Sequence, residues 1–215
     1  MPKIKHRNHA TISKILNLRL AVLLSNIVFQ GIRYMSLGEK IYKIAITFLF
    51  ALLINIFLQN VVLSIVIGHF LNYIFNGQYY VVFRYLSSKR TMSKKDLEEF
   101  IILIERLSVF FTPKDVLVIG SFCRGKMSLT SDLDIRLYHD SGFVSSIKSY
   151  LMASVLRFYG LKLKFPIDIF CFSDLIFLDK ISEKETPVNF MNNSDVLDKY
   201  PLSKNYKQQL KELIL

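Results

Sequence analysis

The sequence predicts an α+β protein in which an α-helical, membrane-associated region precedes a domain of helices and strands. Residues 44–83 contain no Lys, Arg, Asp or Glu, which predicts helices in a membrane. Apolar residues recur at intervals of three and four over 93–111, which predicts an amphipathic helix. Short apolar runs of strand character follow at 116–119 and 133–138. The 215 residues leave room for one ordinary domain and an appendage.

The basic residues flank the uncharged segment. Residues 1–43 carry eight Lys or Arg and one acid, residues 84–96 carry five and one, and residues 97–215 carry fifteen of each. A nucleic-acid-binding protein needs its positive charge around the site that holds the phosphates. The charge distribution therefore argues against a nucleic-acid partner. The distribution predicts attraction to anionic membrane lipid and retention of the domain on the cytoplasmic side.

The cysteine content points to a reducing compartment. The chain has two cysteines, Cys123 and Cys171, with no paired CxxC spacing. This pattern argues against a disulfide scaffold and against a zinc site. No base is placed to activate Cys123, so we expect it to pack in the core.

Residues 1–43 are interpreted as a basic tail followed by an interfacial helix. Residues 12–35 are apolar but contain Lys14, Arg19 and Arg33, which suits a helix lying in the membrane interface. A buried core helix of a soluble domain is the alternative.

Residues 44–83 are interpreted as a membrane helical hairpin or re-entrant segment. Forty uncharged residues exceed one crossing and just suffice for two. Asn55, Gln59 and Asn60 lie near the middle and predict a turn. Both flanks are basic, so both face the cytoplasm. Each apolar arm has only about 15 residues, fewer than a crossing needs, which favours a short or re-entrant hairpin.

A glycine and three polar residues lie on one face of the second arm: Gly68, His69, Asn72 and Asn76. Polar groups at membrane depth either pack against another helix or serve a function. We favour packing, within the chain or between copies in a homo-oligomer. The alternative is a polar lining for a lipid-linked headgroup.

Residues 84–96 form a basic linker, and 97–215 form the domain. The amphipathic helix has Ser93 as its predicted N-cap and ends at Thr112 and Pro113. The later predictions are a helix at 143–158, an extended segment at 161–172 interrupted at Pro166, a short strand in the PVNF run that starts at Pro187, and a helix at 206–215.

The candidate site lies in the segment IGSFCRGKMSLTSDLDIRLY, residues 119–138. Gly120 and Ser121 follow a strand directly, so backbone amides there can face a phosphate. Asp132 and Asp134 are two residues apart in a strand pattern, which places both carboxylates on one face. Adjacent carboxylates with no His or Cys nearby suit Mg²⁺ or Mn²⁺. Asp168 is the candidate third carboxylate, because apolar residues flank it in another strand pattern.

The combination of GSFCRG, SDLDI and PIDIF resembles the polymerase-beta-type nucleotidyltransferases, especially their minimal members, over about residues 97–190. The resemblance implies a small mixed sheet with helices on one face. It also implies transfer of a nucleoside monophosphate from an NTP to an acceptor, with release of pyrophosphate.

The resemblance also implies residue roles. Gly120 and Ser121 would grip the triphosphate. Asp132 and Asp134 would bind two metal ions, Mg²⁺ or Mn²⁺. Asp168 would complete the catalytic metal site and favour deprotonation of the acceptor hydroxyl.

Further nucleotide-binding roles fall on four residues. Arg124 and Lys126 would neutralise phosphate charge, Ser131 would position the phosphate, and Arg136 would meet the substrate. Solvated surface charge is the alternative for Arg124, Lys126 and Arg136.

The chain departs from larger members of that superfamily in its short C-terminal part. Only 47 residues follow Asp168, so there is no room for a large helical acceptor-binding domain, and we expect the tail only to complete the sheet. The leading hypothesis is a membrane-anchored nucleotidyltransferase whose acceptor is lipid-linked, such as an envelope polysaccharide precursor. The alternatives are nucleotidylation of a partner protein or tRNA, and a membrane scaffold that binds nucleotide without turnover.

Overall fold

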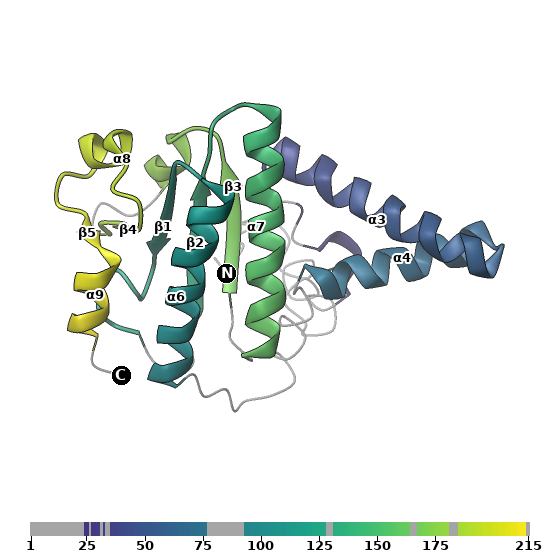
Figure 1. Cartoon of the computed structure of the whole chain (residues 1–215), viewed down its shortest axis with the longest axis horizontal. Coiled ribbons are helices and arrows are strands. Elements are labelled where there is room, and N and C mark those ends of the chain that lie inside the picture. The colour runs from purple at the N-terminus through teal and green to yellow at the C-terminus, as the bar shows by residue number, and fades with distance from the viewer. Residues whose placement is uncertain are drawn as a thin grey trace, which may run out of the picture.

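The computed structural model describes residues 24–25, 27–30, 32, 35–76, 93–127, 131–163, 167–180 and 185–213. Within these residues, a two-helix hairpin projects from a domain of helices packed on a sheet (Figure 1). The predicted basic tail, the first half of the predicted interfacial helix and most of the basic linker lie outside the described residues.

The described elements confirm the predicted α+β class, with seven helices, one of them 3-10, and a five-stranded mixed sheet. The helices are α3 (Leu37–Leu58), α4 (Val61–Phe75), α6 (Lys94–Phe111), α7 (Phe143–Lys162), the 3-10 helix η2 (Ile176–Lys180), α8 (Ser194–Lys199) and α9 (Tyr206–Glu212). The strands are β1 (Asp115–Ile119), β2 (Leu133–Tyr138), β3 (Ile167–Phe172), β4 (Val188–Asn189) and β5 (Lys204–Asn205).

The sheet has the strand order β3-β2-β1-β4-β5. Strand β1 runs antiparallel to both of its neighbours, β2 and β4, whereas β3 is parallel to β2. A parallel pair needs a crossover connection, and α7 provides it between β2 and β3. The register of this pair places Asp134 directly beside Asp168.

Alternation along the strands divides the sheet into two faces. One face packs against α6 and α7 and forms the main core. Its members include Phe100, Ile104, Val116, Val118, Leu133, Ile135, Leu137, Met152, Leu156 and Ile169. Among the described residues, the opposite face is covered at one end, where Leu117 and Tyr138 meet Leu178 and Val196. The other end of that face carries Asp134 and remains open.

Local signals explain the boundaries of α6. Ser93 and Asp96 form a reciprocal capping box at its N-terminus, with the Ser93 hydroxyl accepting from the Asp96 amide at 3.0 Å. The helix ends at Thr112, whose φ of 50° is left-handed, and Pro113 follows. These boundaries confirm the prediction from the sequence.

The prediction was wrong at the junction of α7 and β3. Helix α7 continues to Lys162 instead of ending at 158, and β3 begins at Ile167 instead of 161. Tyr159 and Leu163 pack against the main core, and no proline or glycine breaker occurs between 161 and 165. Tertiary packing therefore carries the helix one turn further than its periodicity indicated.

The predicted hairpin is present, with its turn at Gln59 and Asn60. Gln59 adopts a left-handed φ of 49° and the Asn60 side chain caps α4. The first arm was predicted too short: α3 has 22 residues and begins at Leu37. Its extra turns carry Glu39 and Lys43, which are 1% and 3% exposed, so protein contacts remove both charges from solvent.

The polar face of α4 packs within the chain, which confirms the packing interpretation. Asn72 Nδ2 donates to the Lys43 carbonyl at 3.0 Å and to Thr47 Oγ1 at 2.8 Å. His69 Nε2 lies 2.9 Å from the Ile27 carbonyl oxygen. A methyl group at Gly68 would lie 2.7 Å from the Ala51 nitrogen, so the glycine permits the close approach of α3 and α4.

Replacing Gly68 with Ala is expected to destabilise the hairpin. The added methyl group would meet backbone atoms of Ala51 and Thr47, which cannot move aside as a flexible side chain can. We expect a net loss of about 1 to 2 kcal/mol despite the better helix propensity of Ala. Thermal unfolding of the full chain in detergent measures this loss. Val66→Ala, on an exposed position of α4, is the control, and equal unfolding temperatures for the two variants would contradict the prediction.

Candidate functional site

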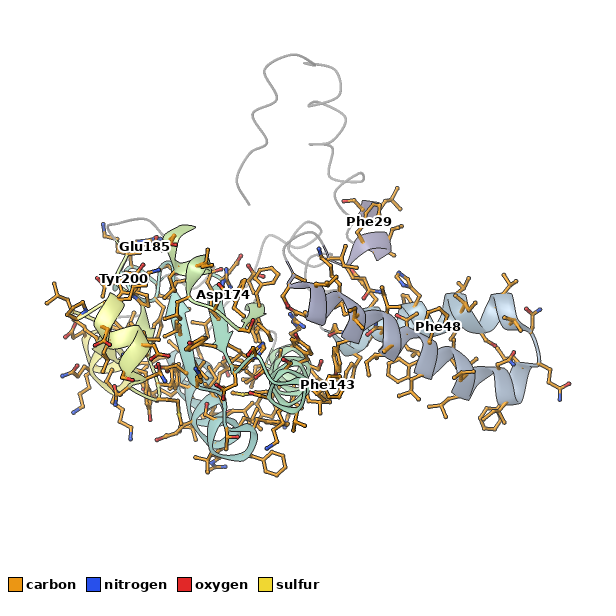
Figure 2. All side chains as sticks on the ribbon, turned by 90° about the horizontal axis from the view of Figure 1, so that it is seen from above. Phe29, Phe48, Phe143, Asp174, Glu185 and Tyr200 are labelled. Atoms are coloured by element: carbon orange, nitrogen blue, oxygen red, sulfur yellow. The ribbon has the colours of Figure 1, made fainter. Side chains whose placement is uncertain are left out.

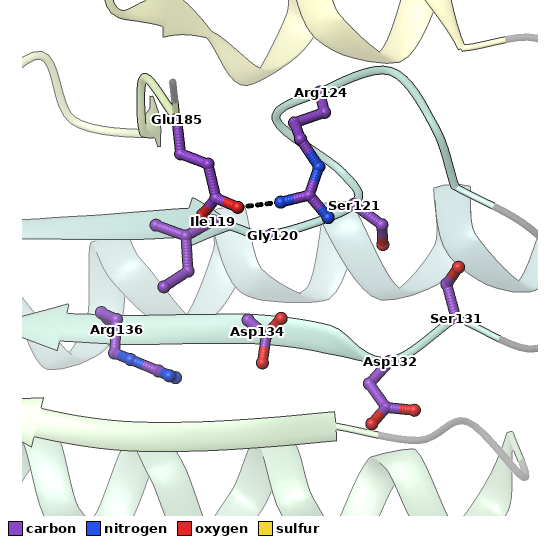
Figure 3. A pocket seen from close by; sticks show the side chains of 9 residues that line it. All are labelled: Ile119, Gly120, Ser121, Arg124, Ser131, Asp132, Asp134, Arg136 and Glu185. Carbon is purple, nitrogen blue, oxygen red and sulfur yellow. Dashed lines mark hydrogen bonds and ion pairs between the residues drawn. The ribbon is translucent and has the colours of Figure 1, made fainter. Parts of the chain in front are cut away.

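A pocket of about 480 Å³ opens on the uncovered end of the sheet, on the face opposite α6 and α7 (Figure 3). Its lining consists of Ile119, Gly120, Ser121, Arg124, Ser131, Asp132, Asp134, Arg136 and Glu185. Seven of these were predicted as site residues. Lys126 and Asp168, also predicted, are not among the lining residues.

The turn after β1 is tight, and it contacts Asp134 directly. Gly120 has a left-handed φ of 75°, and a Cβ built there would lie 2.4 Å from Asp134 Oδ2. Glycine adopts a left-handed φ without strain, and it has no Cβ to collide with the carboxylate. The Lys126 amide donates to the Ser121 carbonyl at 3.0 Å and closes the turn. The Gly-Ser turn and the aspartate are therefore in contact across the pocket.

Helix α9 supports this turn from behind. Gln209 is 2% exposed, and its Nε2 donates to the Phe122 carbonyl at 2.7 Å and approaches the Cys123 carbonyl oxygen at 3.4 Å. The C-terminal tail therefore does more than complete the sheet, which corrects the prediction from the sequence. Nothing in the local sequence around Gln209 indicated this contact, because its partners lie more than 80 residues earlier.

Replacing Gln209 with Ala is expected to loosen the Gly120–Lys126 turn. The loss of about 1 kcal/mol of hydrogen bonding corresponds to a roughly fivefold weaker interaction with whatever the turn binds. On the function proposed below, the KM for the NTP rises by that factor and kcat changes little. Steady-state kinetics with Gln208→Ala, an exposed neighbour, as the control tests this. A parallel fall in kcat with an unchanged KM would contradict it.

The three predicted aspartates lie on the open face. Asp134 alternates with buried Leu133 and Ile135, and the register with β3 brings Asp168 beside it. Burial raises the pKa of the Asp134 carboxyl to about 6, Arg136 opposes this shift, and the charges of Asp168 and Asp132 add to it.

Asp168 lies on the edge strand β3, beside Asp134. Desolvation raises the pKa of its carboxyl, and Arg136 counteracts the shift. The side chain nevertheless remains 49% exposed, so solvent still reaches this carboxylate.

Arg136 lines the pocket and also contacts β3. Its Nη1 donates to the Asp168 carbonyl at 3.1 Å, and its Nη2 lies 3.8 Å from Asp168 Oδ2. The guanidinium also stacks over the Phe170 ring at 4.9 Å. With only 14% of its side chain exposed, Arg136 fixes Asp168 from the β2 side.

Arg124 forms an ion pair with Glu185, a residue that the sequence did not single out (Figure 3). Glu185 lies just before β4 and reaches the pocket from the C-terminal part of the chain. An acid in the polar run KETP gives no local signal of such a role.

Lys126 is exposed, and solvated surface charge describes it as well as phosphate binding does.

Cys123 behaves as a packing residue. Its thiol donates to the Gly120 carbonyl at 3.1 Å, and burial raises its pKa. A thiol with a raised pKa is a poor nucleophile, in agreement with the interpretation from the sequence.

The donors at the site suit a hard divalent cation. Carboxylate oxygens are the ligands that Mg²⁺ and Mn²⁺ prefer, and a cation would offset the burial and, secondarily, the neighbouring negative charges that raise the pKa of Asp134. Among the residues that the structure describes, however, no three His, Cys, Asp or Glu side chains converge as a ready-made metal site. The carboxylates would therefore have to draw together around an ion.

The pocket thus combines a glycine turn, clustered carboxylates and an arginine on the open face of a mixed sheet. Comparisons with models of protein families, with curated proteins and with solved structures find no match to this chain.

Proposed function

We propose that this chain is a membrane-anchored, metal-dependent nucleotidyltransferase. It would transfer a nucleoside monophosphate from an NTP to an acceptor hydroxyl and release pyrophosphate. The observation that carries the proposal is the contact between the Gly120 turn and Asp134, because a backbone turn suited to a phosphate and a carboxylate suited to a metal ion then lie at one pocket. The motif resemblance supports the same reaction.

The proposed reaction forms one bond to phosphorus, breaks another and moves one proton. The acceptor oxygen forms a bond to the α-phosphorus, and the bond from that phosphorus to the bridging oxygen of the β-phosphate breaks. The acceptor proton passes to the half-exposed Asp168 carboxylate, and pyrophosphate leaves with the β and γ groups. Mg²⁺ or Mn²⁺, held by Asp132, Asp134 and Asp168, would supply charge neutralisation for the phosphates.

The remaining residues of the pocket bind and orient the NTP. Backbone amides of the Gly120–Ser121 turn and the Ser131 hydroxyl are the neutral donors. Arg124 supplies positive charge, and it must exchange Glu185 for a phosphate oxygen as the triphosphate enters. Such an exchange replaces one charge-assisted contact with another. The pocket of about 480 Å³ lies within the usual range for small-molecule sites.

The hairpin supports membrane anchoring. Helix α3 is long and apolar enough to cross a membrane by length and composition. Apolar side chains are exposed along both helices, away from the domain (Figure 2). They include Phe48, Leu52, Ile56, Phe57, Val62, Val66 and Phe70. An exposed surface of this kind is typical of a membrane contact. Confinement to the membrane raises the effective concentration of a lipid-linked acceptor, which favours that acceptor class.

The hairpin is expected to enter and leave the membrane on the cytoplasmic side. Glu39 and Lys43 are buried against protein, so only the 15 residues after Lys43 extend freely to the turn. They span about 22 Å, less than the hydrocarbon thickness of about 30 Å.

Re-entry can be tested by labelling the turn. With Gln59→Cys in sealed vesicles, an impermeant maleimide should label the turn from neither side until detergent is added. Leu202→Cys, on the exposed domain surface, is the control for the cytoplasmic side. Labelling of the turn from the far side would contradict re-entry.

Label transfer tests the function itself. Membranes that contain the full chain are incubated with each labelled NTP and Mg²⁺ or Mn²⁺, and lipid, protein and RNA fractions are counted. Labelled lipid is the expected result, and the Asp132→Asn, Asp134→Asn double variant should give none. Label in protein or tRNA would favour those acceptors instead. Nucleotide binding without release of pyrophosphate under either metal would overturn the proposal and leave a scaffold.

A further inference from the structure

The membrane hairpin is joined to the candidate site by a buried ion pair at the edge of the sheet. Arg157 on α7 and Glu39 on α3 are 6% and 1% exposed, and Arg157 Nη2 donates to Glu39 Oε1 at 2.7 Å. The two residues lie 118 positions apart. Burying two charges costs desolvation free energy, which good geometry and further hydrogen bonds must offset. The other hydrogen-bond partners of the pair therefore identify the segments that it connects.

Two of those partners are outward-facing backbone groups of β3. Among the described strands, β3 is at the edge of the sheet and β2 is its neighbour. On its other side, Arg157 Nη2 donates to the Ile169 carbonyl, and Glu39 Oε2 accepts from the Cys171 amide at 3.3 Å. The ion pair therefore takes the place of a neighbouring strand, which an exposed edge otherwise lacks.

Both ends of the hairpin reach the same guanidinium. Glu39 lies in the first turn of α3, and Asn76 caps the end of α4. Asn76 Oδ1 lies 3.4 Å from Arg157 Nη1 and also accepts from the Ser154 hydroxyl at 3.4 Å. Tyr42, on the next turn of α3, belongs to the main core of the domain. The base of the hairpin is thus part of the domain's packing.

This arrangement fixes the strand that carries Asp168. Ile169, which Arg157 contacts, directly follows Asp168, and Arg136 holds the Asp168 carbonyl from the β2 side. Asp168 is therefore located between two arginines, one on β2 and one that the hairpin holds. Partners hydrogen-bonded to a metal ligand commonly change metal affinity 10- to 100-fold when mutated, and Arg157 and Glu39 act one step further out, through the backbone of β3.

We propose that Glu39 and Arg157 are positioning residues that place Asp168 for metal binding, so that the site is complete only when the base of the hairpin is docked on β3. This inference rests on the proposed function, because it assigns Asp168 to a metal ion. It makes the membrane segment a part of the active-site scaffold in addition to an anchor.

Direct metal binding tests the proposal without turnover. Binding of Mn²⁺ to the purified full chain in detergent is measured from the free Mn²⁺ signal in electron paramagnetic resonance. Glu39→Gln removes the charge but keeps an amide oxygen for the Cys171 amide, and we expect its Kd for Mn²⁺ to rise about tenfold. Arg157→Lys keeps the buried positive charge but loses the fork that reaches Glu39, Asn76 and Ile169 together. It should raise the Kd in the same direction.

Lys43→Met is the matched control. Lys43 lies one turn beyond Glu39 on the same helix and is equally buried, but its Nζ donates to the Gln30 carbonyl instead of to β3. Its Mn²⁺ affinity should equal that of the parent while the base of the hairpin stays docked on β3, which parent-like hydrogen exchange of β3 shows. Hydrogen exchange of a peptide covering 167–172 should be faster in Glu39→Gln than in Lys43→Met.

Three results separate the possible failures. Parent-like Mn²⁺ affinity in both Glu39→Gln and Arg157→Lys, with faster exchange in β3, would show a purely structural pair and overturn the positioning role while leaving the proposed function intact. Weakened Mn²⁺ affinity in Lys43→Met as well would attribute the effect to general loosening of the hairpin and also overturn it. Absence of Mn²⁺ binding by the parent protein would overturn the proposed function, and the positioning of a metal ligand with it.

Discussion

Gly120→Ala is expected to abolish label transfer while leaving the protein folded. The new methyl group would lie 2.4 Å from Asp134 Oδ2, so either the carboxylate or the turn must move. Outer-shell changes at metal sites cost 10- to 100-fold, so displacing Asp134, a metal ligand on the proposed function, should cost more than about 100-fold. The left-handed φ of 75° adds roughly 1 to 2 kcal/mol of backbone strain. Turnover and Mn²⁺ binding are the measurements.

Gly125→Ala provides a control for the strain. Gly125 has a similar left-handed φ of 63°, so alanine pays a comparable backbone cost there. Its Cβ would meet only Gln209 Nε2, at 3.8 Å, an ordinary contact. Gly125→Ala should therefore lose stability but keep most turnover. Equal loss of turnover in the two variants would mean that the turn conformation matters and the contact with Asp134 does not.

The spacing of polar residues predicted much of the candidate site. Strand periodicity placed Asp132 and Asp134 on one face, and a glycine directly after a strand predicted the turn at Gly120. These are local signals, because alternation and turn chemistry depend on neighbouring residues. Asp168 was predicted from its apolar flanks, and the parallel register then placed it beside Asp134.

The parts that sequence reasoning missed depend on contacts between distant segments. Glu185, Gln209 and Glu39 reach the site or its supports from separate elements, and their surroundings in sequence resemble ordinary surface or helix positions. Glu39 in particular reads as an exposed acid near a basic cluster, whereas the fold buries it against β3. Predicting such a partner requires knowing which strand lies at the sheet edge, and periodicity does not supply that.

The second large effect concerns Asp134→Asn, for which stability and activity should change in opposite directions. Burial raises the pKa of the Asp134 carboxyl from 3.8 to about 6 in the folded protein. A carboxyl with a raised folded pKa favours folding only while it is protonated, so its ionisation lowers stability as pH rises from about 4 through about 6. Without metal at pH 7.5, Asp134→Asn should therefore be more stable than the parent by about 3 kcal/mol, and at pH 4 most of this difference should be lost.

Metal binding should reverse that order. An ion that binds the folded parent stabilises it by mass action, and it needs the ionised carboxylate, so Mn²⁺ should raise the unfolding temperature of the parent at pH 7.5 much more than at pH 5. Asp134→Asn should show no such increase at either pH and should lose more than about 100-fold in turnover. Thermal unfolding of the full chain with and without Mn²⁺ measures the effect on stability, and label transfer measures turnover.

Two outcomes would contradict these expectations. A metal-free Asp134→Asn protein no more stable than the parent at pH 7.5 would contradict the burial of this charge. A retained Mn²⁺ effect would remove Asp134 from the metal site. Higher stability of Asp134→Asn without metal, together with the loss of its Mn²⁺ effect, would show that the charge at Asp134 destabilises the metal-free fold and is compensated by a bound ion.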